Sequence, residues 1–164
     1  MLGPSTGQLH QIRVDDGLFF SACVLHDLGL VAAHNGLDGS RTCFAEEGGR
    51  AAHAYALQHQ QTPERCDRLA DAISLHLNVR VGLRQGAEAH LLHERTTLGM
   101  VGARGRELHA NTRRAVRRQY PRLDLAEQMQ ATMQDQALRR PTSRAAWLVG
   151  LGFNGMVASH QRRQ

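Results

Sequence analysis

Apolar positions along the chain recur at helical spacing in several separate stretches. Leu69, Ile73 and Leu77 follow one another at every fourth residue, and Met129 and Met133 do the same further along. Positions three or four apart share one face of a helix, so this spacing predicts amphipathic helices with one buried face. No stretch of useful length alternates between apolar and polar residues, as a half-buried strand would. The pattern therefore predicts an all-α fold.

Turn and capping residues divide the chain into its predicted elements. Thr62 followed by Pro63 is typical of a helix start, because Thr can cap and Pro is tolerated in the first turn. Gly29 and Pro121 are expected to end helices, and Pro141 marks a break before the last one. We predict six or seven helices, placed at residues 18–28, 45–60, 63–77, 87–101, 106–119, 125–138 and 143–157.

A chain of 164 residues is long enough for one domain with a core of its own. Residues 1–17 are polar and interrupted by Gly and Pro, so we predict a flexible N-terminal arm there and a helical domain at residues 18–160. Hydrophobic residues make up 41% of the chain and charged residues 21%, which is typical of a globular protein. With aromatic residues at 4%, the core has to be built from Leu, Val, Ala and Met.

Three features bear on where the protein resides. No apolar run approaches the ~20 residues that a membrane-spanning helix needs. The first residues show no basic segment followed by an apolar one, so no secretory signal is predicted. The cysteines, Cys23, Cys43 and Cys66, are odd in number and widely spaced, which is typical of reduced thiols. We therefore expect a cytoplasmic protein with no membrane partner.

The net charge of +5 comes entirely from arginine, because the chain has no lysine. Residues 113–118 hold four arginines, and such a run can contact a phosphate-rich partner. No aromatic residues are interleaved with it, and no known nucleic-acid motif accompanies it. We interpret the run as a solvated helix face and do not expect nucleic acid as a partner.

Two adjacent polar residues, His26 and Asp27, end the apolar stretch at residues 18–28. Burying them is costly unless each is hydrogen-bonded, paired or bound to a metal. Imidazole and carboxylate are good ligands for Zn²⁺, Fe²⁺ or Mn²⁺, and a metal that they bind can lower the pKa of its water to about 7. Taken alone, the pair has a second interpretation: an Asp near a helix end beside a packing or capping His.

The sequence around His26 and Asp27 favours a metal site over a capping or packing pair. Residues 25–30 (LHDLGL) resemble the central motif of the HD-domain superfamily of metal-dependent hydrolases. Four more segments resemble the cyanamide hydratase-like branch of that superfamily, in its order and approximate spacing: 44–48 (FAEEG), 71–76 (DAISLH), 120–122 (YPR) and 140–142 (RPT). The resemblance covers roughly residues 14–160. It implies an HD-domain-like helical bundle that binds divalent metal and hydrolyses phosphoesters or hydrates a small nitrile-type substrate.

The resemblance also implies roles for particular residues. His26 and Asp27 would be metal ligands. His76 would shuttle protons or donate a hydrogen bond to the substrate, and Asp71 would orient a ligand or the water. His76 stands among apolar residues near a helix end, so it also fits a core or capping histidine.

The chain departs from the family pattern at both outer metal ligands. The upstream His belongs on a preceding antiparallel helix, roughly 25 residues or more before His26, and His10 is too close to be it. We therefore expect the first helix of the fold to be missing, as a truncated reading frame or a misplaced start would explain. The downstream Asp aligns with Gly99, which offers no ligand atom; His93 and Glu94 are candidate substitutes on the same helix.

These observations lead to one expectation and two alternatives. We expect a metal-dependent hydrolase or hydratase that acts on a small molecule, binds one divalent metal (Zn, Fe or Mn) weakly and has impaired activity. The first alternative is an HD phosphohydrolase acting on a nucleotide or phosphoester. The second is a non-catalytic remnant that serves as a binding module. A homo-oligomer is compatible with each of them.

Overall fold

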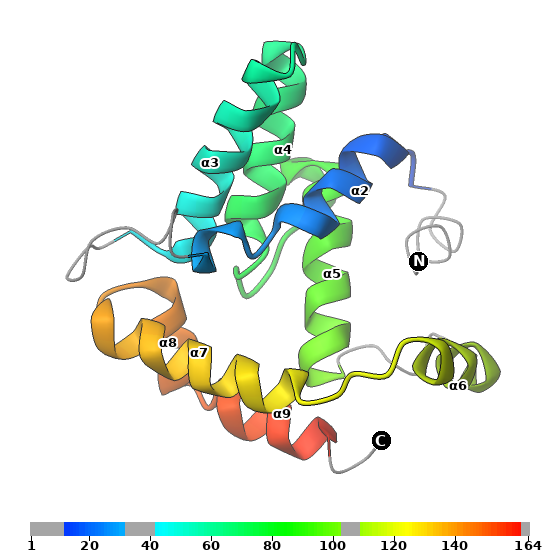
Figure 1. Cartoon of the computed structure of the whole chain (residues 1–164), viewed down its shortest axis with the longest axis vertical. Coiled ribbons are helices and arrows are strands. Elements are labelled where there is room, and N and C mark those ends of the chain that lie inside the picture. The colour runs from blue at the N-terminus through cyan, green and yellow to red at the C-terminus, as the bar shows by residue number, and fades with distance from the viewer. Residues whose placement is uncertain (1–11, 32–41, 103–108, 162–164) are drawn as a thin grey trace.

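The computed structural model describes residues 12–31, 42–102 and 109–161, and every regular element within these ranges is a helix (Figure 1). The all-α prediction is therefore confirmed. The α-helices are α2 (Asp16–Leu25), α3 (Phe44–Gln58), α4 (Pro63–Leu75), α5 (Ala87–Val101), α6 (Ala110–Gln119), α7 (Leu125–Arg139), α8 (Arg144–Gly150) and α9 (Phe153–Gln161). Two short 3₁₀ helices, η1 (Leu28–Leu30) and η2 (Leu83–Gln85), complete the described elements.

Side-chain oxygen atoms cap the starts of α2, α4 and α8. The Asp15 carboxylate accepts a hydrogen bond from the backbone N–H of Leu18 at 2.9 Å and so caps α2. Thr62 caps α4 with Pro63 in its first turn, as the sequence predicts, and Ser143 caps α8. In each case the side-chain oxygen satisfies an N–H that has no partner inside the helix.

The predicted single helix at residues 143–157 is wrong, because the chain forms two helices there. The break lies at Leu151 and Gly152, where Gly152 has a φ of +89°. That left-handed conformation suits glycine and ends α8, so the described part of the chain contains eight α-helices instead of six or seven.

The beginning of the described chain also differs from the prediction. Helix α2 starts at Asp16, and Ile12 and Val14 pack against the core, so residues 12–17 belong to the helical domain. The rest of the predicted arm lies outside the described residues. Prediction placed the end of this helix at residue 28, but the α-helix ends at Leu25 and η1 follows.

The helices form two groups joined by α5 (Figure 1). Helices α3 and α4 run side by side, with α2 and the upper part of α5 packed against α4. Helices α7, α8 and α9 form the second group across the other end of α5. Ala and Leu dominate the described core, as composition predicts, whereas Val, Phe and Cys each supply two of its buried residues and Met supplies one. One buried cluster spans α2–α5, and the other joins the start of α3 to α7 and α8.

Helix α6 stands apart from both groups in Figure 1, and none of its residues is buried. This agrees with the interpretation of its arginine run as a solvated face. Among the described helices, none has both the length and the apolar character that crossing a membrane requires.

Candidate functional site

A close approach between two glycines positions the His26-Asp27 end of α2. A Cβ on Gly29 would overlap the carbonyl oxygen of Phe44 and would lie 2.9 Å from the amide nitrogen of Gly48. Only glycine therefore lets η1 lie directly against the first turns of α3. The contact joins two of the segments that carry the family resemblance, residues 25–30 and 44–48.

His26 follows the last residue of α2 and is held by two hydrogen-bonding contacts. Its Nδ1 lies 2.9 Å from the carbonyl oxygen of Cys23, and its Nε2 lies 3.2 Å from Oδ2 of Asp27. A carbonyl oxygen only accepts hydrogen bonds, so Nδ1 carries the hydrogen. Burial would lower the pKa of His26, but its hydrogen bond to Asp27 and the charge of that carboxylate outweigh burial and raise it.

Asp27 lies between two imidazole rings. Its Oδ1 is 3.9 Å from Nε2 of His76, and the rings of His26 and His76 meet edge-on with centroids 5.3 Å apart. Burial would raise the pKa of Asp27, but the hydrogen bond and charge of His26, joined by His76, lower it. The carboxylate is therefore ionised at neutral pH and faces two ring nitrogens.

His76 follows the last residue of α4 and is buried. Its Nδ1 donates to the carbonyl oxygen of Ile73 at 2.6 Å, which leaves the Nε2 lone pair pointing towards Asp27. Burial, followed by the charge of His26, lowers the pKa of His76 to about 4, so the ring is neutral at pH 7. The structure thus brings together three of the four residues that the sequence singled out.

Asp71, the fourth, does not join them. Its side chain is exposed, and it does not line the cavity beside His76. Positions five apart do not share a helix face, so the turn of α4 that buries His76 directs Asp71 elsewhere. The predicted role of Asp71 in orienting a ligand or a water has no support in this geometry.

Helix α5 contributes His93 to the same region. His93 is buried, and its Nδ1 lies 3.2 Å from the carbonyl oxygen of His76. Glu94, the other proposed substitute for the missing Asp, does not line the cavity. Gly99 does line it, and a Cβ built at that position would meet no atom within 4 Å.

A cavity of about 560 Å³ opens beside His26, Asp27 and His76. Its other walls come from α5 and from the second group of helices. Nothing in the sequence predicts it, because its walls are far apart along the chain. The residues that α7, α8 and α9 contribute are apolar: Leu125, Met129, Met133, Leu148, Phe153 and Met156.

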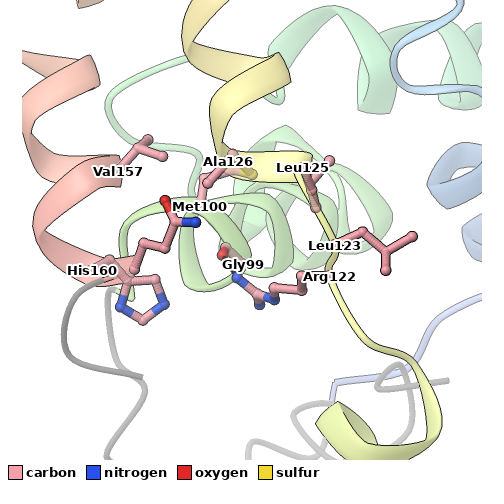
Figure 2. Close-up of a pocket in the computed structure, with 9 residues that line it drawn as sticks. Gly99, Met100, Arg122, Leu123, Leu125, Ala126, Val157 and His160 are labelled. Atoms are coloured by element: carbon pink, nitrogen blue, oxygen red, sulfur yellow. Dashed lines mark hydrogen bonds between the residues drawn. The ribbon is translucent and has the colours of Figure 1, made fainter.

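A second hollow of about 190 Å³ also borders Gly99 (Figure 2). Arg122, from the segment at residues 120–122, donates a hydrogen bond to the carbonyl oxygen of Gly99, and Val157 and His160 of α9 line the same hollow. Burial lowers the pKa of Arg122. Gly99 thus borders both hollows.

Two arginines tie the remaining resemblance segments together. Arg140 is fully buried, with Nη2 2.9 Å from Oε2 of Glu47 and Nη1 3.3 Å from the carbonyl oxygen of Thr42. Nη2 of Arg144 lies 3.2 Å from Oε1 of Glu46. These contacts fix the start of α3 to the turn between α7 and α8, so residues 44–48 and 140–142 lie together.

The donor chemistry of the cluster suits a divalent cation, because the two Nε2 atoms that face the Asp27 carboxylate each offer a lone pair when their imidazole is neutral. Within the described residues, however, no three His, Cys, Asp or Glu side chains surround a common point as a ligand set. The chain matches no protein-family profile and no curated protein sequence.

Proposed function

We propose that this chain is an HD-domain metal-dependent hydrolase or hydratase that acts on a small molecule, with an incomplete metal site and correspondingly low activity. The observation that carries the proposal is the arrangement of His26, Asp27 and His76 at the wall of the cavity. In both imidazoles Nδ1 donates a hydrogen bond to a backbone carbonyl oxygen. In both, Nε2 faces the carboxylate of Asp27.

The contact between His26 and Asp27 requires a positive charge. With Nδ1 protonated, a neutral His26 would direct its Nε2 lone pair at an ionised carboxylate 3.2 Å away. Either a second proton on the ring or a cation that both groups bind removes this repulsion. The raised pKa of His26 corresponds to the second proton on the ring. A divalent metal would be the cation that both groups bind.

In this proposal His26 and Asp27 hold the metal, and His76 lies beside it. A divalent cation bound there would supply the Lewis acidity that lowers the pKa of a water molecule. His76 is buried and neutral, so its Nε2 can accept a proton or a hydrogen bond from a water in the cavity. His26 and Asp27 are partly exposed, so a substrate held against the apolar walls would displace water from the cluster and strengthen these interactions.

Weak metal binding follows from the small ligand set. Structural and catalytic zinc sites use three or four protein ligands, whereas here two or three groups are available. We therefore expect a dissociation constant weaker than micromolar for Zn²⁺ or Mn²⁺. Calorimetric titration of the purified, chelator-stripped chain measures this dissociation constant. Micromolar or tighter binding would contradict the proposal that the metal site is incomplete.

The chain offers a matched control for the site. His53 and Asp67 form another His-Asp pair, 3.1 Å apart, on the surface. Replacing His26 by Ala should abolish the metal binding, and His53→Ala should leave it unchanged. Equal effects of both substitutions would place the metal elsewhere. A chain that binds no metal and turns over neither nitriles nor phosphoesters would be the non-catalytic remnant.

A further inference from the structure

The cavity beside His26 and Asp27 is larger and more apolar than a small nitrile requires. Its volume of about 560 Å³ falls in the range of sites that enclose organic ligands of moderate size. The polar cluster occupies one part of the wall, and the wall formed by α7, α8 and α9 offers apolar side chains alone. A ligand that fills this space has to present an extended apolar surface.

Methionine is concentrated around the cavity. Four of the five methionines in the chain line it: Met100, Met129, Met133 and Met156. The methionine side chain is unbranched, flexible and polarisable, so it adapts to apolar groups of different shapes. The wall is therefore suited to an apolar tail whose shape it does not strictly define.

Apolar residues also line the cavity at exposed positions. Val79, Leu151 and Met156 all line it, and their exposed fractions are 67%, 58% and 45%. Exposed apolar side chains that gather at a concave site mark contact with an apolar partner. The exposed part of the lining is therefore apolar at these three positions.

The charges of the lining disfavour a phosphate-bearing ligand. Recognition of phosphate relies on several cationic or N–H donors around the group. Among the described residues that line the cavity, Arg95 is the sole arginine, and the imidazole of His26 already faces the carboxylate of Asp27, so its charge is offset at the polar end. An uncharged ligand fits this wall better than a nucleotide does.

We infer that the cavity accepts an elongated, uncharged molecule, such as a medium-chain alkyl amide or nitrile, with its polar group at His26, Asp27 and His76. The apolar tail lies against α7, α8 and α9. The binding of the tail follows from the cavity alone. The statement that the polar group is the one that reacts rests on the proposed function.

A series of linear amides tests the tail. Butanamide, hexanamide and octanamide are titrated calorimetrically into the full chain in the presence of EDTA. Affinity should rise about fourfold for each added methylene, the fold-change that corresponds to about 0.8 kcal/mol. Adenosine monophosphate should bind more weakly than octanamide. Affinities that do not change with length, or tighter binding of the nucleotide, would overturn the inference.

Two exposed apolar positions provide the variant and its control. Met156 lines the cavity, whereas Leu138 of α7 is 74% exposed and does not. Met156→Glu should weaken octanamide binding at least tenfold, and Leu138→Glu should leave it unchanged. An equal loss in both variants would mean that the amides bind nonspecifically. A dimer of the free chain that Met156→Glu dissociates would make this surface an interface between copies and overturn the inference.

Turnover separates this inference from the proposed function. Hydration of octanenitrile and hydrolysis of octanamide are measured after addition of Zn²⁺ or Mn²⁺. Length-dependent binding without turnover contradicts the proposed enzyme and supports the apolar cavity. Turnover of a small phosphoester, with amide affinities independent of chain length, supports a hydrolase and overturns the apolar cavity.

Discussion

The position of a single hydrogen on His26 determines what its other ring nitrogen can do. Because Nδ1 donates to the carbonyl of Cys23, Nε2 is left to face Asp27. That these two residues and His76 share a site is implied by the family resemblance, because their positions at helix ends fit capping or packing residues equally well. The five-residue spacing already sets Asp71 and His76 on different faces of a helix, but tertiary packing decides which of these faces meets the site.

Gly99 offers a direct test of the metal proposal at the scale of one residue. It lines the cavity, and a Cβ there would meet no atom within 4 Å, so the backbone leaves room for a side chain to begin. If the family resemblance aligns it with the missing Asp, Gly99→Asp should strengthen Zn²⁺ or Mn²⁺ binding at least tenfold. Gly99→Asn is the control of equal size without the charge. Calorimetry measures both, and unchanged affinity in Gly99→Asp would contradict the alignment.

The pH dependence of stability tests the burial of His76 in the chelator-treated chain. The folded pKa is about 4 and the unfolded value about 6.5, so the unfolded chain binds more protons between these pH values. The stabilisation that depends on neutral His76 is therefore fully present in the free energy of unfolding above pH 6.5. It is lost as the pH falls towards 4. Its full loss corresponds to about 3 kcal/mol in the free energy of unfolding.

Urea unfolding in EDTA at pH 7 and pH 5 measures this loss. His76→Gln removes the titrating group and leaves His26 and Asp27 in place, so it should lose less stability over that interval than the native chain. Identical pH profiles of the two chains would show that His76 is not held neutral.

At the scale of elements, most helices could be predicted, and their ends less well. Periodicity and the Thr62-Pro63 start predict α4, because these signals are local. The sequence does not predict the break at Gly152, because a glycine within a helical pattern is often tolerated and only its positive φ marks the boundary. The close packing of η1 on α3 could not be predicted either, because the two elements are not adjacent in the sequence and no local pattern links them.

The contact between η1 and α3 leads to a stability prediction. A methyl group on Gly29 would overlap backbone atoms of Phe44, which cannot move aside as a flexible side chain could. Gly29→Ala should therefore lower the free energy of unfolding by about 2–4 kcal/mol, within the range of overpacking and backbone strain. Thermal or urea unfolding measures the change.

Gly155 of α9 is the matched control, because a Cβ there meets no atom within 4 Å. Gly155→Ala should raise stability by up to about 1 kcal/mol, the difference in helix propensity between the two residues. A neutral Gly29→Ala substitution would mean that η1 does not pack directly on α3.

At the scale of the whole molecule, the cavity and the ion pairs between the two helix groups depend on residues about a hundred positions apart. Arg140 and Glu47 lie far apart in sequence, and neither carries a local signal of burial. The ordered resemblance segments predicted that these regions belong to one domain. They could not show that an arginine would be fully buried between them, because charged residues are ordinarily exposed.

Arg140 supplies the last prediction. Its guanidinium is buried against Glu47, so Arg140→Met removes the charge that offsets a carboxylate largely shielded from water. Removing one partner of a buried ion pair costs about 3–5 kcal/mol. The neighbouring Arg139 pairs with Asp135 one turn away on the surface of α7, and Arg139→Met should cost under about 0.5 kcal/mol. Urea unfolding measures both.

Replacing both partners separates the lost charge from lost packing. The double variant Arg140→Met with Glu47→Gln should recover part of the stability, because no ionised group then remains buried at this contact. If the double variant is as unstable as Arg140→Met alone, the guanidinium acts through packing and its bond to the Thr42 carbonyl. If Arg140→Met costs no more than Arg139→Met, the tie between α3 and the second helix group does not hold the cavity together.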